Sequence, residues 1–383
     1  MTTSTKRFRS TPTMRALAAC IRGRVPAMLW GQPGRGKTAV VEALGRAWAM
    51  HTEVVIGSIR EASDFLGQGV EVGGGEGVIG SIAYAPPRWA KAAAEAESAL
   101  VLGDEITTCP ASVRKAWLRV LQERFAGDLR LPDTVAMITA GNPPDTAVDG
   151  YDLEAPVANR LIHLDFEFPQ DDWLEGLATG FDHLAMPTLV ELIGHGHDSH
   201  RATIRGQVTA FLHARRDLID VDVPTDPVVA GRGWPSRRSW TNAIAAMSET
   251  LPGDTETLIL LLAGAVGSGP AREFLSFASS LDLPTPEEAI ARRGEIDWAA
   301  LRPDQVYAVA TSLRAYVVNG HADAETWLGA LKCLTLIAEA GLPDLAQSAV
   351  TSLLRERPDG AAIPPRVRDA FSELFVGIGR WAA

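Results

Sequence analysis

The sequence is poor in cysteine. Three of its 383 residues are cysteines, and they lie far apart, at Cys20, Cys109 and Cys333. An odd, scattered set excludes a dense disulfide framework and supplies no paired cysteine motif for structural zinc. This usage is typical of a reducing compartment, and we expect a cytoplasmic protein.

Long apolar runs and a basic surplus are also lacking. No apolar stretch approaches the roughly 20 residues that a membrane-spanning helix needs. The first ten residues are polar and basic without an apolar segment behind them, so we expect a disordered tail at 1–10 and no secretory signal. The 36 Lys and Arg against 47 Asp and Glu give a net charge of −11. This charge disfavours nucleic acid as a partner, because phosphate binding needs a basic surface.

A phosphate-binding pattern, G-x-x-x-x-G-K-[ST], is present after the apolar run 25–30 and is matched at every fixed position. Glycine lets backbone N–H groups close around phosphate oxygens. Lys37 can then reach the β- and γ-phosphates, and the Thr38 hydroxyl can bind Mg²⁺. The residues predicted to bind ATP are Gly31, Gln32, Pro33, Gly34, Arg35, Gly36, Lys37 and Thr38. The alternative is a glycine-rich turn that binds nothing.

Apolar strands alternate with helical periodicities over the first 169 residues. The pattern predicts strands at 25–30, 53–57, 99–102, 135–140 and 161–166. Helices are predicted between them, notably at 88–97 and 111–123. Such alternation is typical of a five-stranded parallel sheet covered on both faces, a three-layer α/β/α domain over 11–169.

The strand signal fades after residue 169. We expect an all-α lid over 170–275 and a C-terminal helical region over 276–383, with a candidate boundary at the proline-rich stretch 283–286. The predicted helices of this part are 203–219, 237–249, 303–318, 325–340 and 343–355.

Polar residues follow two of the predicted strands. Asp104 and Glu105 come at the carboxyl end of the third strand, where open α/β sheets bind ligands. Asp104 could hold Mg²⁺ through water, and Glu105 could orient and deprotonate the water that attacks the γ-phosphate. Asn142, after the fourth strand, could hydrogen-bond this water and the γ-phosphate. The alternatives are a solvated strand end and a turn-forming asparagine.

The ordered motifs resemble those of the AAA+ ATPases and, within them, the MoxR branch. The segments that carry the resemblance are 63–67, 104–106 with Pro110, 140–143 and 158–161. The likeness covers about residues 12–275 and is strong over the first 166. It implies a P-loop AAA+ domain that hydrolyses ATP with Mg²⁺. It also implies a homo-oligomeric ring, expected to be a hexamer, and a chaperone-like role toward a protein partner, with a von Willebrand A-type domain as the implied partner class.

The resemblance also implies roles for single residues. Residues 31–38 resemble the Walker A loop, Asp104 and Glu105 the Walker B pair, and Asn142 sensor 1. Arg160 resembles the arginine finger that enters a neighbouring subunit's site, although the family more often has Asp-Arg-Phe where this chain has Asn-Arg-Leu. Arg238 aligns best with sensor 2, and Arg237 is the alternative. The implied catalytic residues are Lys37, Glu105, Asn142, Arg160 and Arg238.

Two further questions stay open at this point. Residues 69–84 predict a hairpin around a glycine-rich tip, which could contact a client protein or be purely structural. The chain could also be a nucleotide-gated assembly scaffold with little turnover, or a DNA-remodelling motor, which the acidic charge disfavours.

Overall fold

The computed structural model describes residues 8–73, 80–143, 152–181, 185–195, 197–321 and 323–372. The chain forms two compact units. Unit 1 comprises Met1–His195 and Val221–Gly269, and unit 2 comprises Gly196–Asp220 and Pro270–Ala383. The domain limits expected after residues 169 and 275 do not coincide with these unit limits, and the stretch 283–286 lies inside unit 2.

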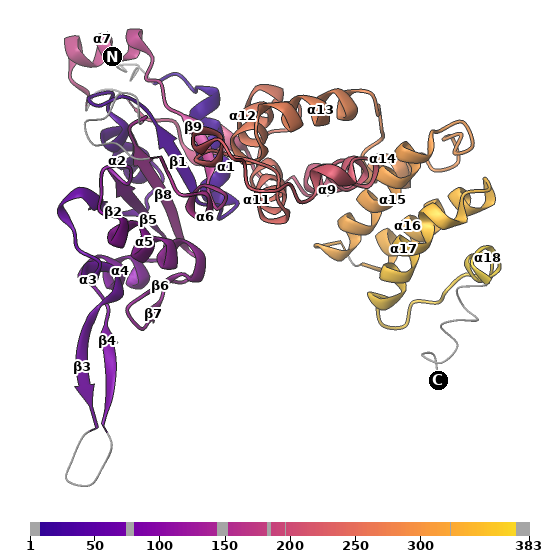
Figure 1. Ribbon diagram of the computed structural model, residues 1–383. Coiled ribbons are helices and arrows are strands. Elements are labelled where there is room, and N and C mark those ends of the chain that lie inside the picture. The colour runs from indigo at the N-terminus through magenta and orange to yellow at the C-terminus, as the bar shows by residue number, and fades with distance from the viewer. Residues whose placement is uncertain are drawn as a thin grey trace, which may run out of the picture. The chain divides into compact units, whose positions relative to one another are not determined.

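A five-stranded parallel sheet forms the centre of unit 1 (Figure 1). The strand order is β2-β5-β8-β1-β9, and every pairing is parallel. The strands are β1 (Ala27–Trp30), β2 (His51–Ile56), β5 (Ala99–Asp104), β8 (Val135–Gly141) and β9 (Ile162–Asp165). Each overlaps a strand predicted from the sequence, so the α/β fold class is confirmed.

Helices cover the sheet because both of its faces are apolar. Neighbouring residues such as Leu100 and Val101 point to opposite faces, and both are fully buried. Trp117 of α5 packs so closely on Gly103 that an added Cβ would lie 2.5 Å from its ring. The helices of this part are α1 (Pro12–Arg22), α2 (Lys37–Ala47), α3 (Ser63–Leu66), α4 (Arg88–Glu95), α5 (Ala111–Glu123) and α6 (Ala155–Ala158).

The residues just before α1 are packed. Phe8 is buried, with 8% of its surface exposed, and its N–H donates to the carbonyl of Ala185 at 3.1 Å. Arg9 also pairs with Asp171 at 2.7 Å, so the last part of the expected tail has defined contacts at Phe8 and Arg9. Residues 1–7 lie outside the described residues.

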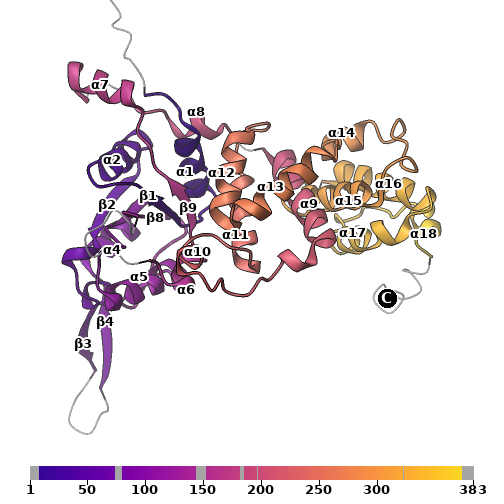
Figure 2. The same ribbon diagram turned by 45° about the horizontal axis from the view of Figure 1, so that its top comes forward.

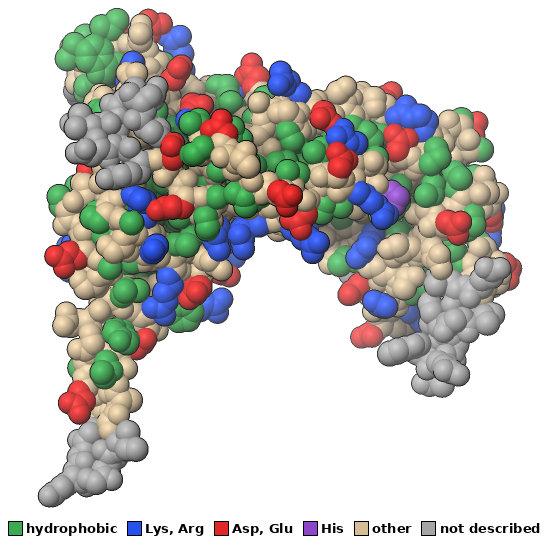
Figure 3. Space-filling view, in the orientation of Figure 1, with side chains coloured by type: hydrophobic (Ala, Val, Ile, Leu, Met, Phe, Trp, Pro, Cys, Tyr) green, Lys and Arg blue, Asp and Glu red, His purple; other side chains and the backbone are tan. Residues whose placement is uncertain are grey.

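A two-stranded antiparallel ribbon extends from the sheet domain (Figures 1 and 2). Its strands are β3 (Gln68–Val72) and β4 (Ser81–Ala85), which confirms the predicted hairpin, while its tip at 74–79 lies outside the described residues. Figure 3 shows hydrophobic side chains along it. The large hydrophobic residues that its strands expose are Val70, Val72, Ile82 and Tyr84. A short second hairpin, β6 (Phe125–Ala126) with β7 (Leu129–Arg130), supports its base through a hydrogen bond from Tyr84 N–H to Asp128 at 2.6 Å.

The remainder of unit 1 is helical, with α11 and α12 packed against α1 and β9. Helix α11 begins with a capping box, in which Ser236 and Ser239 exchange side chain to backbone hydrogen bonds. The helices are α7 (Gln170–Thr179), α8 (Leu189–Ile193), α10 (Pro227–Ala230), α11 (Arg237–Met247) and α12 (Thr255–Val266), and a 3-10 turn η1 (Gly57–Ile59) follows β2.

Unit 2 is helical and has its own apolar core. Its first helix packs along a later one, with Gly206 so close to Ala308 that an added Cβ would lie 2.5 Å from the Ala308 carbonyl oxygen. Its elements are α9 (Asp198–Ala214), η3 (Arg216–Leu218), α13 (Ser268–Ser279, which starts in unit 1), α14 (Pro286–Ala291), α15 (Pro303–Val318), α16 (Ala324–Glu339), α17 (Pro343–Arg355) and α18 (Pro365–Ala370). Within the described ranges, none of the helices has the length and apolar character needed to cross a bilayer.

Candidate functional site

The glycine-rich loop connects β1 to the start of α2 at the carboxyl edge of the sheet. Gly34 and Gly36 adopt left-handed backbone conformations, with φ of +75° and +80°, and open space surrounds both positions. Gly36 caps α2 without a side-chain hydrogen bond. The first N–H groups of α2 are therefore available to a ligand, and the positive end of the helix dipole favours an anion there.

Lys37 lies inside this loop and is only 8% exposed. Its ammonium donates to the Gly31 carbonyl at 2.5 Å and to Asn142 Oδ1 at 2.9 Å. Burial lowers the pKa of Lys37, while the charges of Asp104 and Glu105 act in the opposite direction. A buried cation with mostly neutral partners is electrostatically unsatisfied and would gain from a bound anion.

Thr38 and Asp104 form the second contact between the loop and the strand ends. The Thr38 hydroxyl donates to Asp104 Oδ2 at 2.5 Å. A hydroxyl and one carboxylate are hard oxygen donors, and Mg²⁺ is usually held by one or two such groups together with phosphate oxygens and water. The residues present therefore fit Mg²⁺, and the described part of the chain contains no cluster of three or more His, Cys, Asp or Glu that could hold another metal.

Glu105 follows directly, with its side chain exposed and its φ at +57°. Its Oε2 accepts a hydrogen bond from the hydroxyl of Ser58, in the turn after β2. Sequence analysis missed Ser58. The only local signal was its place directly after the predicted strand 53–57. The pairing of β2 with β5, with Ile56 opposite Asp104, brings the two strand ends together.

Asn142 lies at the end of β8, between β1 and β5 in the sheet. Its backbone N–H donates to the hydroxyl of Thr107, a fully buried residue, at 3.1 Å. Its side chain contacts Lys37, as given above. The structure thus brings together Lys37, Thr38, Asp104 and Asn142, which the sequence placed on three separate segments.

Arg160 lies away from the glycine-rich loop. It precedes β9, in which Ile162 pairs with Ala27 at the start of β1, whereas the glycine-rich loop follows the other end of β1. The two are therefore separated by at least the length of a four-residue strand, about 10 Å. The guanidinium of Arg160 donates to the Pro156 carbonyl and to the Gln122 side chain.

Arg238 lies on the same side of the sheet as Arg160. Both are linked to helix α11, in whose first turn Arg238 lies, because the Asn242 side chain of that helix donates to the Arg160 carbonyl at 3.2 Å. Burial lowers the pKa of Arg160, and the positive charge of Arg238 acts in the same direction. Arg237 and Arg238 are both exposed in the first turn of α11. The predicted site residues thus form two groups. One surrounds the glycine-rich loop at the carboxyl edge of the sheet, and the other consists of Arg160 and Arg238 at the opposite edge.

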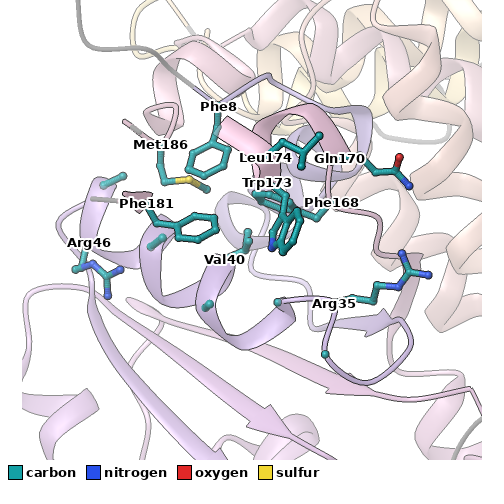
Figure 4. A pocket seen from close by; sticks show the side chains of 15 residues that line it. Phe8, Arg35, Val40, Arg46, Phe168, Gln170, Trp173, Leu174, Phe181 and Met186 are labelled. Atoms are coloured by element: carbon teal, nitrogen blue, oxygen red, sulfur yellow. The ribbon is translucent and has the colours of Figure 1, made fainter. Parts of the chain in front are cut away.

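An aromatic pocket of about 770 Å³ opens beside the loop, between α2 and α7 (Figure 4). Phe8, Phe168, Trp173 and Phe181 turn toward the same space, while Arg35 and Arg46 lie at its two ends (Figure 4). The loop contributes 34–36 to the lining. The pocket is mostly apolar and has the size of a small-molecule site.

Comparison with known proteins adds little. Neither a family model nor a curated protein matches the sequence. Among solved structures, the chain is similar to the crystal structure of a candidate ATPase from Cytophaga hutchinsonii, at 15% identity and a TM-score of 0.44. The match covers 72% of this chain and 90% of that chain. Function must therefore be inferred from the residues of the site.

Proposed function

We propose that the protein is a Mg²⁺-dependent ATPase whose triphosphate site is the glycine-rich loop. The observation that carries the proposal is the convergence of three strand ends on that loop. Lys37 contacts Asn142 at 2.9 Å, and Thr38 contacts Asp104 at 2.5 Å. A buried ammonium, a hydroxyl with a carboxylate, and an uncapped helix start together suit a phosphate chain and its metal.

In this proposal each residue has a distinct task. Lys37 exchanges its present partners for the β- and γ-phosphates, and Glu105 accepts a proton from the attacking water. Asn142, held by Thr107, orients that water against the γ-phosphate. Bound Mg²⁺, held through Thr38 and Asp104, would neutralise charge on the phosphates.

The aromatic pocket suits the base of the nucleotide. It adjoins Gly34 and Gly36, and the flat rings of Phe168 and Trp173 offer stacking surfaces for adenine. Replacement of Trp173 by alanine should therefore raise KM for ATP more than it lowers kcat.

The arginine group supports hydrolysis at a shared site. Arg160 and Arg238 lie at the sheet edge opposite the glycine-rich loop of the same chain, too far away to act on a phosphate bound there. Guanidinium groups stabilise the charge that develops on a transferred phosphoryl group only when they lie close to it. We infer that they serve the loop of a neighbouring copy, in a homo-oligomeric ring that we expect to be a hexamer.

A mixing experiment tests this proposal. Wild-type protein should hydrolyse ATP in the presence of Mg²⁺, and Lys37→Ala and Arg160→Ala should each lose at least about tenfold in kcat. Mixing the two variants should restore activity, because a copy with intact arginines then faces a copy with an intact loop. Arg119→Ala, an exposed arginine paired with Glu123, is the control. Absence of ATP hydrolysis by the wild type would refute the activity, and failure of the mixture would refute the shared site.

ATP turnover in such a ring would remodel or mature a protein partner, and a partner with a von Willebrand A-type domain is our first candidate. The exposed apolar ribbon β3–β4 is the part of unit 1 that we expect to touch it. The Glu105→Gln variant with ATP should retain the partner in a pull-down, because hydrolysis is blocked while binding is intact. Equal recovery with wild-type and Glu105→Gln protein would argue against this role.

A nucleotide-gated scaffold with little turnover is the second candidate, and one observation favours it. The Glu105 carboxylate already accepts a hydrogen bond from Ser58, so one of its oxygens is engaged and not open to water. If the wild type assembles with ATP but releases phosphate no faster than Glu105→Gln, the scaffold is the better description.

A further inference from the structure

Asn159, directly before Arg160, is buried in a closed hydrogen-bond network. It is 5% exposed and forms the C-cap of α6. Its side-chain Nδ2 donates to the Trp234 carbonyl at 3.0 Å, and its Oδ1 accepts from the Ser236 hydroxyl at 2.6 Å. Both partners belong to the segment that leads into α11. One neutral side chain therefore ties the turn of Arg160 to the start of α11.

The orientation of this amide is fixed by its partners. The Trp234 carbonyl oxygen can only accept, and it also accepts from the Ser239 hydroxyl at 2.8 Å. The amide must therefore present its NH₂ group to Trp234 and its oxygen to Ser236. A carboxylate at this position would place a second acceptor against the Trp234 carbonyl in a buried site, which is strongly unfavourable.

The network reaches both arginines of the group described above. Ser236 is the N-cap of α11, so the position of Arg238 in the first turn depends on it. The Asn242 side chain of the same helix donates to the Arg160 carbonyl at 3.2 Å. The turn of Arg160 and the start of α11 are therefore joined by side-chain hydrogen bonds of both Asn159 and Asn242.

We infer that Asn159 is a positioning residue that sets the spacing between Arg160 and Arg238 at the shared site. The inference rests on the proposed function, in which these arginines act on ATP bound by a neighbouring copy. It also assigns a reason for a neutral amide at this position, since the side chain must donate to a carbonyl on one side and accept from a hydroxyl on the other.

Asn159→Asp tests the inference, because it keeps the volume of the side chain and removes the donor. If Asn159 is a positioning residue, its substitution should affect ATP hydrolysis only by displacing Arg160 and Arg238. We expect kcat to fall at least about tenfold while KM for ATP stays within about twofold of the wild type, because the variant's own loop is intact. Asn319→Asp, at an exposed asparagine that bonds the Ala315 carbonyl in unit 2, should leave both values unchanged.

Mixing separates positioning from a loss of folding. Asn159→Asp mixed with Lys37→Ala should recover activity to the level of Arg160→Ala mixed with Lys37→Ala, because the Lys37→Ala copies supply well-placed arginines. In a background that carries both Arg160→Ala and Arg238→Ala, Asn159→Asp should cost no further activity. Ser236→Ala, a milder change in the same network, should lower kcat in the same way if Asn159→Asp does not fold.

The outcomes are distinguishable from a failure of the proposed function. If Arg160→Ala and Lys37→Ala do not complement each other, the shared site itself is wrong, and the inference falls with it. If they do complement, then wild-type kcat in both Asn159→Asp and Ser236→Ala overturns the inference alone. Failure of folded Asn159→Asp to complement Lys37→Ala overturns it in the same way.

Discussion

Burial and hydrogen bonding fix the protonation of single residues in unit 1, and His163 on β9 is the clearest case. Its Nδ1 accepts from Trp30 Nε1–H at 2.9 Å, so Nε2 carries the proton and donates to the Ala158 carbonyl at 3.0 Å. The pKa of His163 is lowered to about 4, mainly by burial and to a smaller extent by the charge of Arg232, while the hydrogen bond to the Ala158 carbonyl acts in the opposite direction.

The lowered pKa of His163 predicts that the folded protein becomes less stable in acid. The folded state holds His163 neutral, whereas the unfolded chain takes up a proton below its ordinary pKa of 6.5. The stabilisation is complete above that value and is lost as the pH falls toward 4. We expect His163 to account for a loss of about 2 kcal/mol in the free energy of unfolding between pH 7 and pH 5.

Urea unfolding at the two pH values measures this loss. His163→Gln should flatten the pH dependence, because glutamine can accept from Trp30 and donate to Ala158 without titrating. Equal slopes for the wild type and His163→Gln would contradict the assignment.

Removal of the Ser58 hydroxyl is expected to raise the rate of ATP hydrolysis. This hydroxyl donates to the Glu105 carboxylate and so occupies an oxygen that would otherwise accept the proton of the attacking water. Ser58→Ala should raise kcat about two- to tenfold in a steady-state phosphate-release assay. Ser279→Ala, at an exposed serine of α13, is the matched control. A fall in kcat for Ser58→Ala would mean that Ser58 instead holds Glu105 in its working position.

At the scale of elements, α5 depends on one glycine for its contact with β5. A Cβ at Gly103 would lie 2.5 Å from the Trp117 ring, directly before Asp104. Gly103→Ala should therefore lower the free energy of unfolding by about 1–3 kcal/mol through overpacking. It should also lower ATPase activity, because Asp104 must shift with its strand.

Chemical denaturation with a double-mutant cycle checks this prediction. Trp117→Phe makes room for the new methyl group and should recover part of the loss in Gly103→Ala, since the indole N–H has no partner within the described residues. Gly269→Ala, where nothing lies within 4 Å, should cost almost nothing. Additive effects of the changes at 103 and 117 would argue against this contact.

Elements with a clear period could be predicted from the sequence. Helix α5 has the predicted bounds 111–123, and α15 has the predicted bounds 303–318, because both carry an apolar stripe at helical spacing. Helix α12 was not predicted individually. Its run Leu258–Ala263 is apolar at every position, and periodicity cannot tell such a run from a buried strand.

The loop group could likewise be predicted, since each of its residues follows a recognisable strand. The contacts of Asn159 could not be predicted from the sequence. Its partners Trp234 and Ser236 lie more than 70 residues away on a segment without periodicity, and only the packing of α11 against β9 brings them together. Side-chain networks of this kind depend on tertiary contacts that no local pattern encodes.

At the scale of the whole molecule, the two units are interleaved along the chain. Unit 2 takes α9 from between two parts of unit 1, and α9 packs along α15. The buried face of α9 includes Ile204, Val208 and Phe211. Truncation after residue 269 therefore keeps α9 but removes the helix on which it packs.

This arrangement makes a prediction about truncated chains. A chain that ends at residue 269 keeps α9 but loses α15, so the apolar face of α9 is exposed to water, and the protein should aggregate or bind a hydrophobic dye. A second chain, in which 196–220 is also replaced by a Gly/Ser linker of the same length, should stay monodisperse and still bind ATP through Lys37. Light scattering and calorimetric titration with ATP and Mg²⁺ would separate the two chains. If the simple truncation is soluble and monodisperse, α9 does not need unit 2, and the interleaving has no energetic consequence.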